Sequence, residues 1–597
     1  MRVTRTGNPA APRSEFRVDQ SHTYDLRSPI RWILSHLLRY RWLLAGFLLT
    51  SLLATASYTL IPRIAGLAFD AVLQPGGGTE ALLSASLLLL AVALTGGLME
   101  LLGAAHFVEN IAQRFERDAR AELTLSLLGK SQAFHNRQRV GDIMARASND
   151  VRQLNMMFSP GVQLIADSML GLILPLVLIQ AIDWRLLLFP VLFVISFALA
   201  LRGYQRRLDP VSRAMRREFG HLNASLTETI TGIELVKSAA QEDQERLKFA
   251  SRAETVRDWF VAQGEVQARY LPILLIGLAL TGTFAHGLLL LAAGQITVGE
   301  LVAVVGMVGV LRGPAGLSSF TFALVQLGIA SAGRILELIT STTELDENPE
   351  GHAARVAGDI DFEDVTFLFE PGSTPALDRV SFRAAAGATV AIVGQTGSGK
   401  SSLVRLINRT FDATEGTVRI DGVDVRDWNM DSLRQQIAVI EQDIFLFSRS
   451  VADNIAFGLP GATREQVLAA ARAAQAHDFI TGFPEGYETV IGERGMTLSG
   501  GQRQRLAIAR ALLTDPRILV LDDATSAIDS ATEDAIQTAI ANVLEGRTAF
   551  IITHRLSQIR RADHIVVLDQ GRVLDQGTHE ELLSRSGLYG RIFARFD

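Results

Sequence analysis

The octapeptide Gly394-Gln-Thr-Gly-Ser-Gly-Lys-Ser401 decides how the C-terminal part of this chain folds. It matches the pattern G-x-x-x-x-G-K-[ST] and directly follows the apolar run 389–393, which has the composition of a buried strand. Its glycines let the backbone approach a bound anion closely. Successive N–H groups and the N-terminus of the next helix can then surround a phosphate. The octapeptide therefore predicts a phosphate-binding loop between a strand and a helix.

The side chains of this loop and of a second strand predict the nucleotide and its metal. Lys400 is suited to contact the β- and γ-phosphates, and the hydroxyl of Ser401 is suited to ligate Mg²⁺. Residues 518–523 form an apolar strand that ends in two carboxylates, Asp522 for Mg²⁺ and Asp523 for the attacking water. We expect ATP and Mg²⁺ as cofactors. The expected nucleotide contacts in the loop are Gly394, Gln395, Thr396, Gly397, Ser398, Gly399, Lys400, Ser401 and Ser402.

The surroundings of the loop predict an α/β domain. Short β-branched runs alternate with helical segments, a pattern typical of a largely parallel sheet. The predicted strands are 389–393, 437–440, 518–521, 549–552 and 564–568. The predicted domains are a polar tail (1–27), a transmembrane domain (28–340), a linker (341–357) and a nucleotide-binding domain (358–597).

The region upstream of the linker is apolar enough to cross a membrane. Of the 597 residues, 48% are hydrophobic, and three upstream runs are long and free of charge. About 20 helical residues cross a hydrocarbon layer of ~30 Å. Three weaker runs bring the expected spans to six, at 43–61, 81–99, 161–182, 186–201, 270–294 and 301–333.

The charges around these spans predict the topology. Arg27, Arg31, Arg39 and Arg41 precede the first span, so the N-terminus is expected in the cytoplasm of a bacterial-type inner membrane. An even number of spans returns the C-terminus to the same side. The formal net charge of −6 gives no case for nucleic-acid binding. The absence of Cys excludes disulfides, thiol nucleophiles and Cys-ligated metals.

The segment Leu498-Ser-Gly-Gly-Gln502 resembles the signature of the ATP-binding cassette (ABC) transporters. The resemblance runs from about Ser28 to the C-terminus and has the form of an exporter-type (type IV) half-transporter. It implies an all-α domain of six transmembrane helices followed by an α/β P-loop ATPase domain. It also implies ATP-driven export of an amphipathic drug, lipid or peptide by alternating access.

The resemblance also assigns roles to single residues. Phe369 stands where an aromatic ring stacks on adenine, Gln442 in the Q-loop that contacts Mg²⁺ and water, and His554 at the switch histidine. Asp529 matches the D-loop, and Glu493 matches the acidic loop before the signature. The signature residues expected to contact nucleotide are Ser499, Gly500, Gly501 and Gln502. Segments 140–150 and 219–232 resemble the two coupling turns that rest on the cassettes.

One departure from the family pattern concerns the catalytic carboxylate, which is usually Glu and here is Asp523. Asp is one methylene shorter, and a displacement of about 1 Å can cost on the order of 10²-fold in rate. An intact signature with a weakened carboxylate favours one subunit of a heterodimeric exporter. The retained His554 favours the alternative, a slowly hydrolysing homodimer. An importer with the same fold, for instance of a siderophore, and a regulatory half with little hydrolysis also stay open.

Ionisable residues inside the expected spans have two interpretations. They are Glu100, Asp167, His286 and Arg312, with Pro314 as an expected kink. Such groups are costly in a bilayer and either pair with one another, for example Arg312 with Asp167, or face a polar cavity that receives substrate.

Overall fold

The computed structural model describes residues 14–16, 18, 22–73, 79–270, 272–492, 495, 497–522, 530–585, 587 and 589, without the side chains of 272–273, 315–319 and 530–535. The chain divides into two compact units. The helical unit comprises Ser21–Thr124 and Gly141–Thr340. The nucleotide unit comprises Ser341–Asp597 together with Met1–Gln20 and Leu125–Val140.

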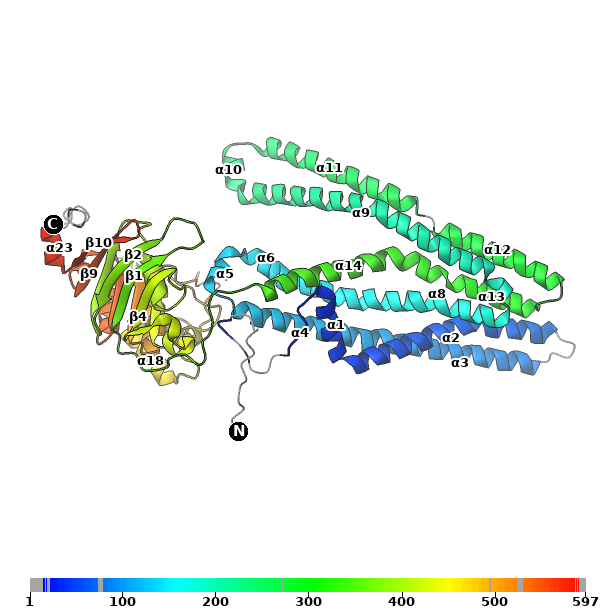
Figure 1. The fold of residues 1–597 in the computed structure, drawn as a ribbon, viewed down its shortest axis with the longest axis horizontal. Coiled ribbons are helices and arrows are strands. Elements are labelled where there is room, and N and C mark those ends of the chain that lie inside the picture. Colours follow the sequence, from blue (N-terminus) through cyan, green and yellow to red (C-terminus); the bar gives the residue numbers. More distant parts are fainter. Residues whose placement is uncertain are drawn as a thin grey trace. The chain divides into compact units, whose positions relative to one another are not determined.

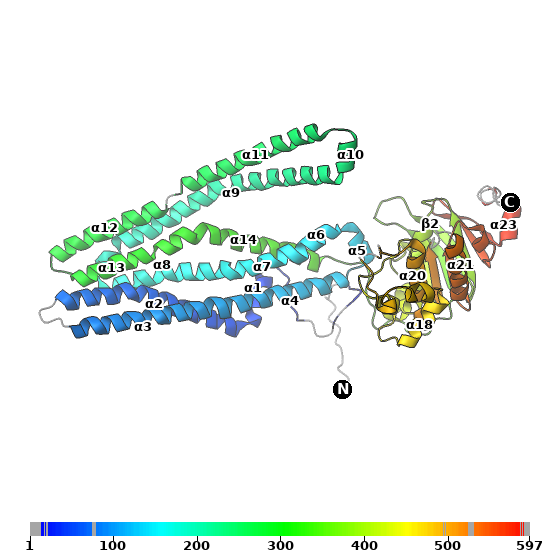
Figure 2. The ribbon, with the colours of Figure 1, turned by 180° about the vertical axis from the view of Figure 1, so that it is seen from behind.

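The helical unit is built from long helices, of which α2 and α3 lie side by side in Figures 1 and 2, as do α9 and α11. Its first half consists of α1 (Pro29–Arg39), α2 (Arg41–Leu73), α3 (Thr79–Leu101), η1 (Leu102–Val108), α4 (Glu109–Leu128), α6 (Val140–Ala145), η2 (Arg146–Asp150), α7 (Val151–Met156), η3 (Met157–Val162) and α8 (Gln163–Ile182). Its second half consists of η4 (Trp184–Leu187), α9 (Leu188–Thr231), α10 (Ile233–Ser238), α11 (Glu242–Ala268), α12 (Pro272–Ala292), α13 (Val298–Val310) and α14 (Arg312–Thr340).

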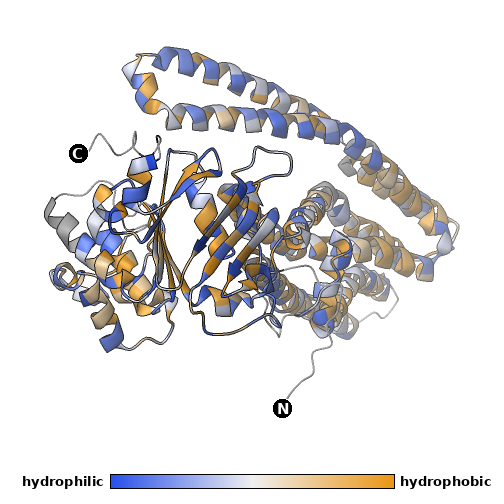
Figure 3. Ribbon diagram, turned by 60° about the vertical axis from the view of Figure 1, so that its left-hand side comes forward, coloured by the Kyte–Doolittle hydropathy of each residue, from blue (hydrophilic) through white to orange (hydrophobic). Residues whose placement is uncertain are grey.

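Six helical stretches in the described part of the chain are long and apolar enough to cross a membrane, which confirms the predicted number. They are Arg41–Leu73, Thr79–Leu128, Val140–Ile182, Trp184–Thr231, Leu274–Ala292 and Phe320–Thr340. Several exceed the roughly 20 residues needed to span, so their ends extend beyond the hydrocarbon. Figure 3 shows this division, because α9 and α11 are hydrophilic near α10, whereas α12 is hydrophobic.

The last predicted span, 301–333, is broken close to Pro314, where we expected a kink. α13 ends at Val310 and α14 begins at Arg312, and the N–H of Leu311 between them bonds to Val308 instead of continuing the α-helical ladder. Pro314 is the third residue of α14, a position where its missing N–H costs little. The predicted pair of Arg312 with Asp167 is wrong, because no described carboxylate forms an ion pair with Arg312 and Asp167 accepts a hydrogen bond from Ser51.

The two predicted coupling turns are wrong in position. Residues 140–150 belong to α6 and η2, where Asp150 pairs with Arg334 of α14 at 2.5 Å and holds the stretch against that helix. Residues 219–232 are the final turns of α9, which ends at Gly232. The short helices that connect the long ones are α5 (Gln132–Arg137) and α10.

The nucleotide unit contains two sheets. The larger has the order β10-β9-β3-β8-β7-β6, in which β9 to β6 are parallel and β10 pairs antiparallel with β9. Its strands are β3 (Thr389–Gly394), β6 (Ile437–Ile440), β7 (Ile518–Asp522), β8 (Thr548–Ile552), β9 (His564–Asp569) and β10 (Arg572–Gly577). All five predicted strands are therefore confirmed.

The smaller sheet is antiparallel, has the order β2-β1-β4-β5 and was not predicted. It consists of β1 (Ile360–Phe367), β2 (Leu377–Ala384), β4 (Glu415–Ile420) and β5 (Val423–Asp424). One apolar cluster joins the two sheets and includes the stacked rings of Phe362 and Phe382, whose centroids are 4.6 Å apart. Ala133 of α5 packs against this cluster, so the short helix α5 lies on the nucleotide unit.

The helices of this unit surround the larger sheet, and Figure 2 shows α18, α20 and α21 among them. They are α15 (Lys400–Ile407), η5 (Val425–Asp427), α16 (Met430–Arg434), α17 (Val451–Ile455), η6 (Ala456–Gly458), α18 (Arg464–Ala473), α19 (His477–Thr481), η7 (Gly486–Glu488), α20 (Gly500–Leu513), α21 (Ser530–Leu544), α22 (Leu556–Ile559) and α23 (His579–Arg585). A second apolar cluster packs α17, α18 and α20 together with β7.

Candidate nucleotide-binding site

The parallel strands place four predicted site residues at one edge of the larger sheet. Ile552 of β8 pairs with Ile392 of β3 on one side and with Asp522 of β7 on the other. The carboxyl ends of these strands therefore adjoin, and ligands of parallel α/β sheets bind outside such ends. The phosphate loop follows β3, His554 follows β8, Asp522 ends β7 and Gln442 follows β6.

The loop after β3 requires glycine at two positions. Gly399 has φ +99° and is the N-cap of α15, and a Cβ on it would lie 2.4 Å from the carbonyl oxygen of Ala376. A Cβ on Gly394 would lie 2.2 Å from the carbonyl oxygen of Leu568. Only glycine fits such close approaches of backbone to backbone. The loop is therefore shaped by the neighbouring chain segments as well as by its own sequence.

Polar groups of the loop are turned toward its centre. The Nζ atom of Lys400 donates hydrogen bonds to the carbonyl oxygens of Gly394 and Gln395, at 3.0 and 2.8 Å. The hydroxyl of Ser398 is buried and has no partner among the described residues, which is unusual for a polar group. Gln395, Thr396 and Gly397 are exposed, Ser401 is half-buried, and Ser402 is buried.

The candidate metal ligands are oxygen donors. Asp522 is 9% exposed at the end of β7, Ser401 is in the first turn of α15, and Gln442 is exposed after β6. Hydroxyl, carboxylate and amide oxygens are ligands that Mg²⁺ accepts, together with phosphate oxygens. The predicted residues Asp523, Asp529 and Glu493 lie outside the described residues. His554 is described and exposed.

Phe369 lies just after β1 and presents its ring to solvent. Its side chain is 49% exposed, and it contacts Phe367 and Phe411 edge to face, with centroid distances of 4.9 and 5.7 Å. These contacts support the ring from one side and leave aromatic surface free. An exposed ring held in this way is available for stacking on a planar base.

The signature segment forms the N-terminus of α20. Ser499 is its N-cap and forms a capping box with Gln502, whose backbone N–H bonds to the Ser499 hydroxyl at 3.2 Å. Ser499 and Gly500 are exposed, whereas Gly501 is buried and Gln502 half-buried. A helix N-terminus with exposed N–H groups attracts anions.

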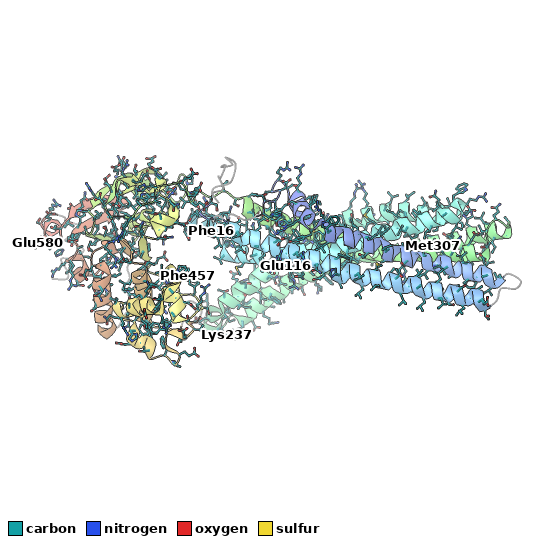
Figure 4. The ribbon with its side chains drawn as sticks, turned by 90° about the horizontal axis from the view of Figure 1, so that it is seen from below. Phe16, Glu116, Lys237, Met307, Phe457 and Glu580 are labelled. Atoms are coloured by element: carbon teal, nitrogen blue, oxygen red, sulfur yellow. The ribbon has the colours of Figure 1, made fainter. Side chains whose placement is uncertain are left out.

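Arg510 lies on the same helix, and the sequence analysis did not predict a role for it. Its guanidinium donates to the carbonyl oxygen of Asn454 at 2.9 Å and to that of Phe445 at 3.2 Å, and it lies over the ring of Phe457, which Figure 4 labels. Burial lowers the pKa of this guanidinium. It ties the signature helix to the segment that follows Gln442. The available signal was an arginine within the run Leu506–Leu513, which is otherwise apolar.

The fold and the site together define a class, a P-loop nucleotide-binding domain joined in one chain to a helical domain that can span a membrane six times. The ABC transporter family matches residues 377–526, and the ABC transporter transmembrane region matches residues 44–315. The chain belongs to the ABC transporter family. It is an integral membrane protein with the exporter-type fold of a half-transporter.

Individual relatives support this assignment. The uncharacterized ABC transporter ATP-binding protein YknU of Bacillus subtilis is 34% identical, with 93% of this chain and 95% of that protein covered. The ATP-dependent lipid A-core flippase of Aromatoleum aromaticum is 35% identical, with 88% of each chain covered. A solved structure of a bacterial Atm1-family ABC exporter with ATP bound has a TM-score of 0.80 and 32% identity, and it covers 93% of this chain and 98% of that chain.

Proposed function

We propose that this ABC exporter chain is one half of a dimer that uses ATP to export an amphipathic drug, lipid or peptide. The observation that carries the proposal is the exposed N-terminus of α20 at Ser499, a second anion-attracting element in a chain that already has a phosphate loop. In a head-to-tail dimer, this element would contact the nucleotide held by the partner's loop. Each ATP would then join the two protomers, and its binding would close them.

The residues of the loop and strand ends supply binding and orientation. Backbone N–H groups of the loop and Lys400 bind the phosphates, and Phe369 stacks on adenine. Gln442 and His554 orient the water and the γ-phosphate, Asp523 accepts a proton from that water, and Asp529 lies toward the protomer contact. Ser401, Asp522 and Gln442 would hold Mg²⁺, which neutralises phosphate charge when bound. Their oxygen chemistry and the unpartnered Ser398 hydroxyl fit a phosphate-bound cation.

The helix α10 supports contact with a second chain. Lys237, labelled in Figure 4, lies on this helix, and Leu235 on the same helix is 72% exposed. Ile233 and Ile230 are also exposed, at 46% and 62%. Exposed apolar patches of this kind mark interaction sites. By contrast, Phe134 of α5 is buried within the nucleotide unit of its own chain.

We favour a heterodimer because of Asp523. In that case the site with this chain's loop is slow, and the site with this chain's signature uses a partner's glutamate. The relative from Aromatoleum aromaticum is a lipid A-core flippase by name. A lipid-like substrate is therefore within the range that we propose, with both termini in the cytoplasm and transport outward.

ATP hydrolysis by the chain purified alone in nanodiscs tests this function. We expect slow hydrolysis that Lys400→Ala abolishes and that Asp523→Glu accelerates by about tenfold or more. Asp569→Glu, the same change at the end of β9, is the matched control and should have no effect. Rapid hydrolysis by the unmodified chain that is coupled to transport would contradict the heterodimer. If Lys400→Ala bound nucleotide as tightly as the unmodified chain, the proposed site would be contradicted.

A further inference from the structure

The helical unit contains a cavity of about 130 Å³ that no part of the proposed ATP cycle uses. It lies between α2, the junction of α3 with η1, and α8. Two carboxylic acids line it, Glu100 from α3 and Asp167 from α8. Phe47, Tyr58 and Met99 are also among the residues that line it.

Each acid accepts a hydrogen bond from one hydroxyl group, and Asp167 also bonds to the side chain of Gln163. Tyr58 Oη donates to Oε2 of Glu100 at 2.5 Å, and Ser51 Oγ donates to Oδ1 of Asp167. A carboxylate accepts up to about four hydrogen bonds, so both acids retain acceptor capacity. Among the described residues, no Lys, Arg or His lines the cavity. The two acids therefore face a shared space in which the protein supplies no positive charge from its described part.

The backbone next to the cavity includes π-helical turns. Gly103 and Ala104, which line the cavity, belong to the π-helical segment η1, and the lining residue Gln163 directly follows a second such segment, η3. π-helical turns occur frequently at functional sites in otherwise regular helices. Glu100 lies about 31 Å along the helix from Thr79, at a rise of 1.5 Å per residue. On the proposed topology, the cavity is therefore in the cytoplasmic half of the bundle.

We propose that this cavity binds the protonated amine of an amphipathic organic cation. The ammonium group donates hydrogen bonds to Glu100 and Asp167 and lies against the faces of Tyr58 and Phe47, which attract cations. The hydrocarbon part extends past Met99. Ionised carboxylates are costly inside a bilayer, and a bound ammonium group would neutralise their charge while using acceptor capacity that the hydroxyl groups leave free. That the bound cation is also the transported substrate rests on the function proposed above.

Binding of dodecylamine to the full-length protein in nucleotide-free nanodiscs, with empty nanodiscs subtracted, tests the proposal. We expect saturable binding that Asp167→Asn and Glu100→Gln each weaken by about tenfold, because each removes a charge-assisted hydrogen bond. Asp209→Asn is the matched control, since Asp209 is exposed on α9 and pairs only with Arg213 among the described residues, and it should bind as the wild type does. Dodecanol has the same hydrocarbon chain and no charge, so its affinity should be the same for the wild type and all three variants.

Two results would overturn the assignment, namely equal dodecylamine affinity in the wild type and both cavity variants, or dodecanol binding as tight as dodecylamine. Thermal unfolding of each variant identifies a misfolded protein, and Tyr58→Phe then serves as a further variant that keeps the ring and removes one hydroxyl. The assay needs no ATP. If dodecylamine binds as expected but is not transported when ATP is added, only the proposed function is contradicted. If it is transported but the cavity variants bind it as tightly as the wild type, only the cavity assignment is contradicted.

Discussion

Arg434 donates a hydrogen bond of 2.8 Å from Nη1 to Oε2 of Glu15, a residue 419 positions earlier in the chain. The same guanidinium donates to the carbonyl oxygens of Asn408 and Arg409. The N–H of Glu15 bonds to the carbonyl oxygen of Gly129, just after α4, at 2.9 Å. A short N-terminal segment thus connects the end of a long helix with the nucleotide-binding fold, within the nucleotide unit.

The first prediction concerns this contact. Glu15→Gln should destabilise the nucleotide unit by about 1 kcal/mol, because the acceptor loses its negative charge and the ion pair with Arg434 becomes a hydrogen bond to a neutral amide. Limited proteolysis of the full-length protein should then cleave the N-terminal segment faster. Glu347→Gln is a matched control. Among the described contacts, Glu347 bonds to Ser14 through its backbone N–H, and its side chain takes no part in that bond. Equal cleavage rates in the two variants would show that the ion pair does not fix the segment.

The second prediction concerns the phosphate loop. Gly399→Ala should lower ATP affinity by at least about tenfold, because its Cβ would meet the carbonyl oxygen of Ala376 and because φ +99° disfavours any side chain. Gly397→Ala separates these causes, since Gly397 lies in the same loop and also has a positive φ, +82°, but a Cβ there meets nothing within 4 Å. Equilibrium binding of a fluorescent ATP analogue measures both. A normal affinity in Gly399→Ala would contradict the close approach.

The third prediction concerns Arg510. Arg510→Leu should lower stability by about 2 kcal/mol and reduce ATP hydrolysis, because two carbonyl groups lose their donor and the signature helix loses its tie to the segment after Gln442. Arg510→Lys should recover part of the stability, since it keeps the charge and loses the planar fork. Arg472→Leu, at an exposed position on α18, is expected to leave both readouts within error. Thermal unfolding and phosphate release are the measurements.

The fourth prediction is a dependence of stability on alkaline pH. Tyr589 is buried, its hydroxyl lies 2.6 Å from Nδ1 of His579, and burial raises its pKa to about 12 from 10.0. Its folded form keeps a proton that the unfolded chain loses, so its contribution is complete below pH 10 and disappears between pH 10 and 12. The contribution is at most about 3 kcal/mol.

Denaturant midpoints of the wild type and Tyr589→Phe at pH 9.5 and 11.5 measure this effect. Phenylalanine cannot ionise, so the wild type should lose more stability than the variant between the two pH values. A constant difference between the two proteins would show that Tyr589 does not titrate in this range.

The elements that the sequence predicted correctly are those with a local signal. Residues 437–440 form a continuous apolar run because β6 is covered on both faces, and the structure places a strand over the same residues. β2 was missed because buried and exposed residues alternate along it, and charged residues such as Arg379 and Arg383 interrupt the apolar pattern. The coupling turns were misplaced because the sequence pattern of 140–150 predicts an amphipathic helix and does not indicate where the neighbouring turn lies.

The amino-acid sequence by itself determined the phosphate loop, the six spans and the parallel strands, because backbone conformation at glycine and burial of an apolar run depend on neighbours along the chain. Only the tertiary structure decided that Asp167 bonds to Ser51 instead of pairing with Arg312, that Glu15 reaches Arg434, and that Glu100 and Asp167 share a cavity. Those relationships depend on which segments pack together, and such packing is set by many weak contacts between residues that are far apart in sequence.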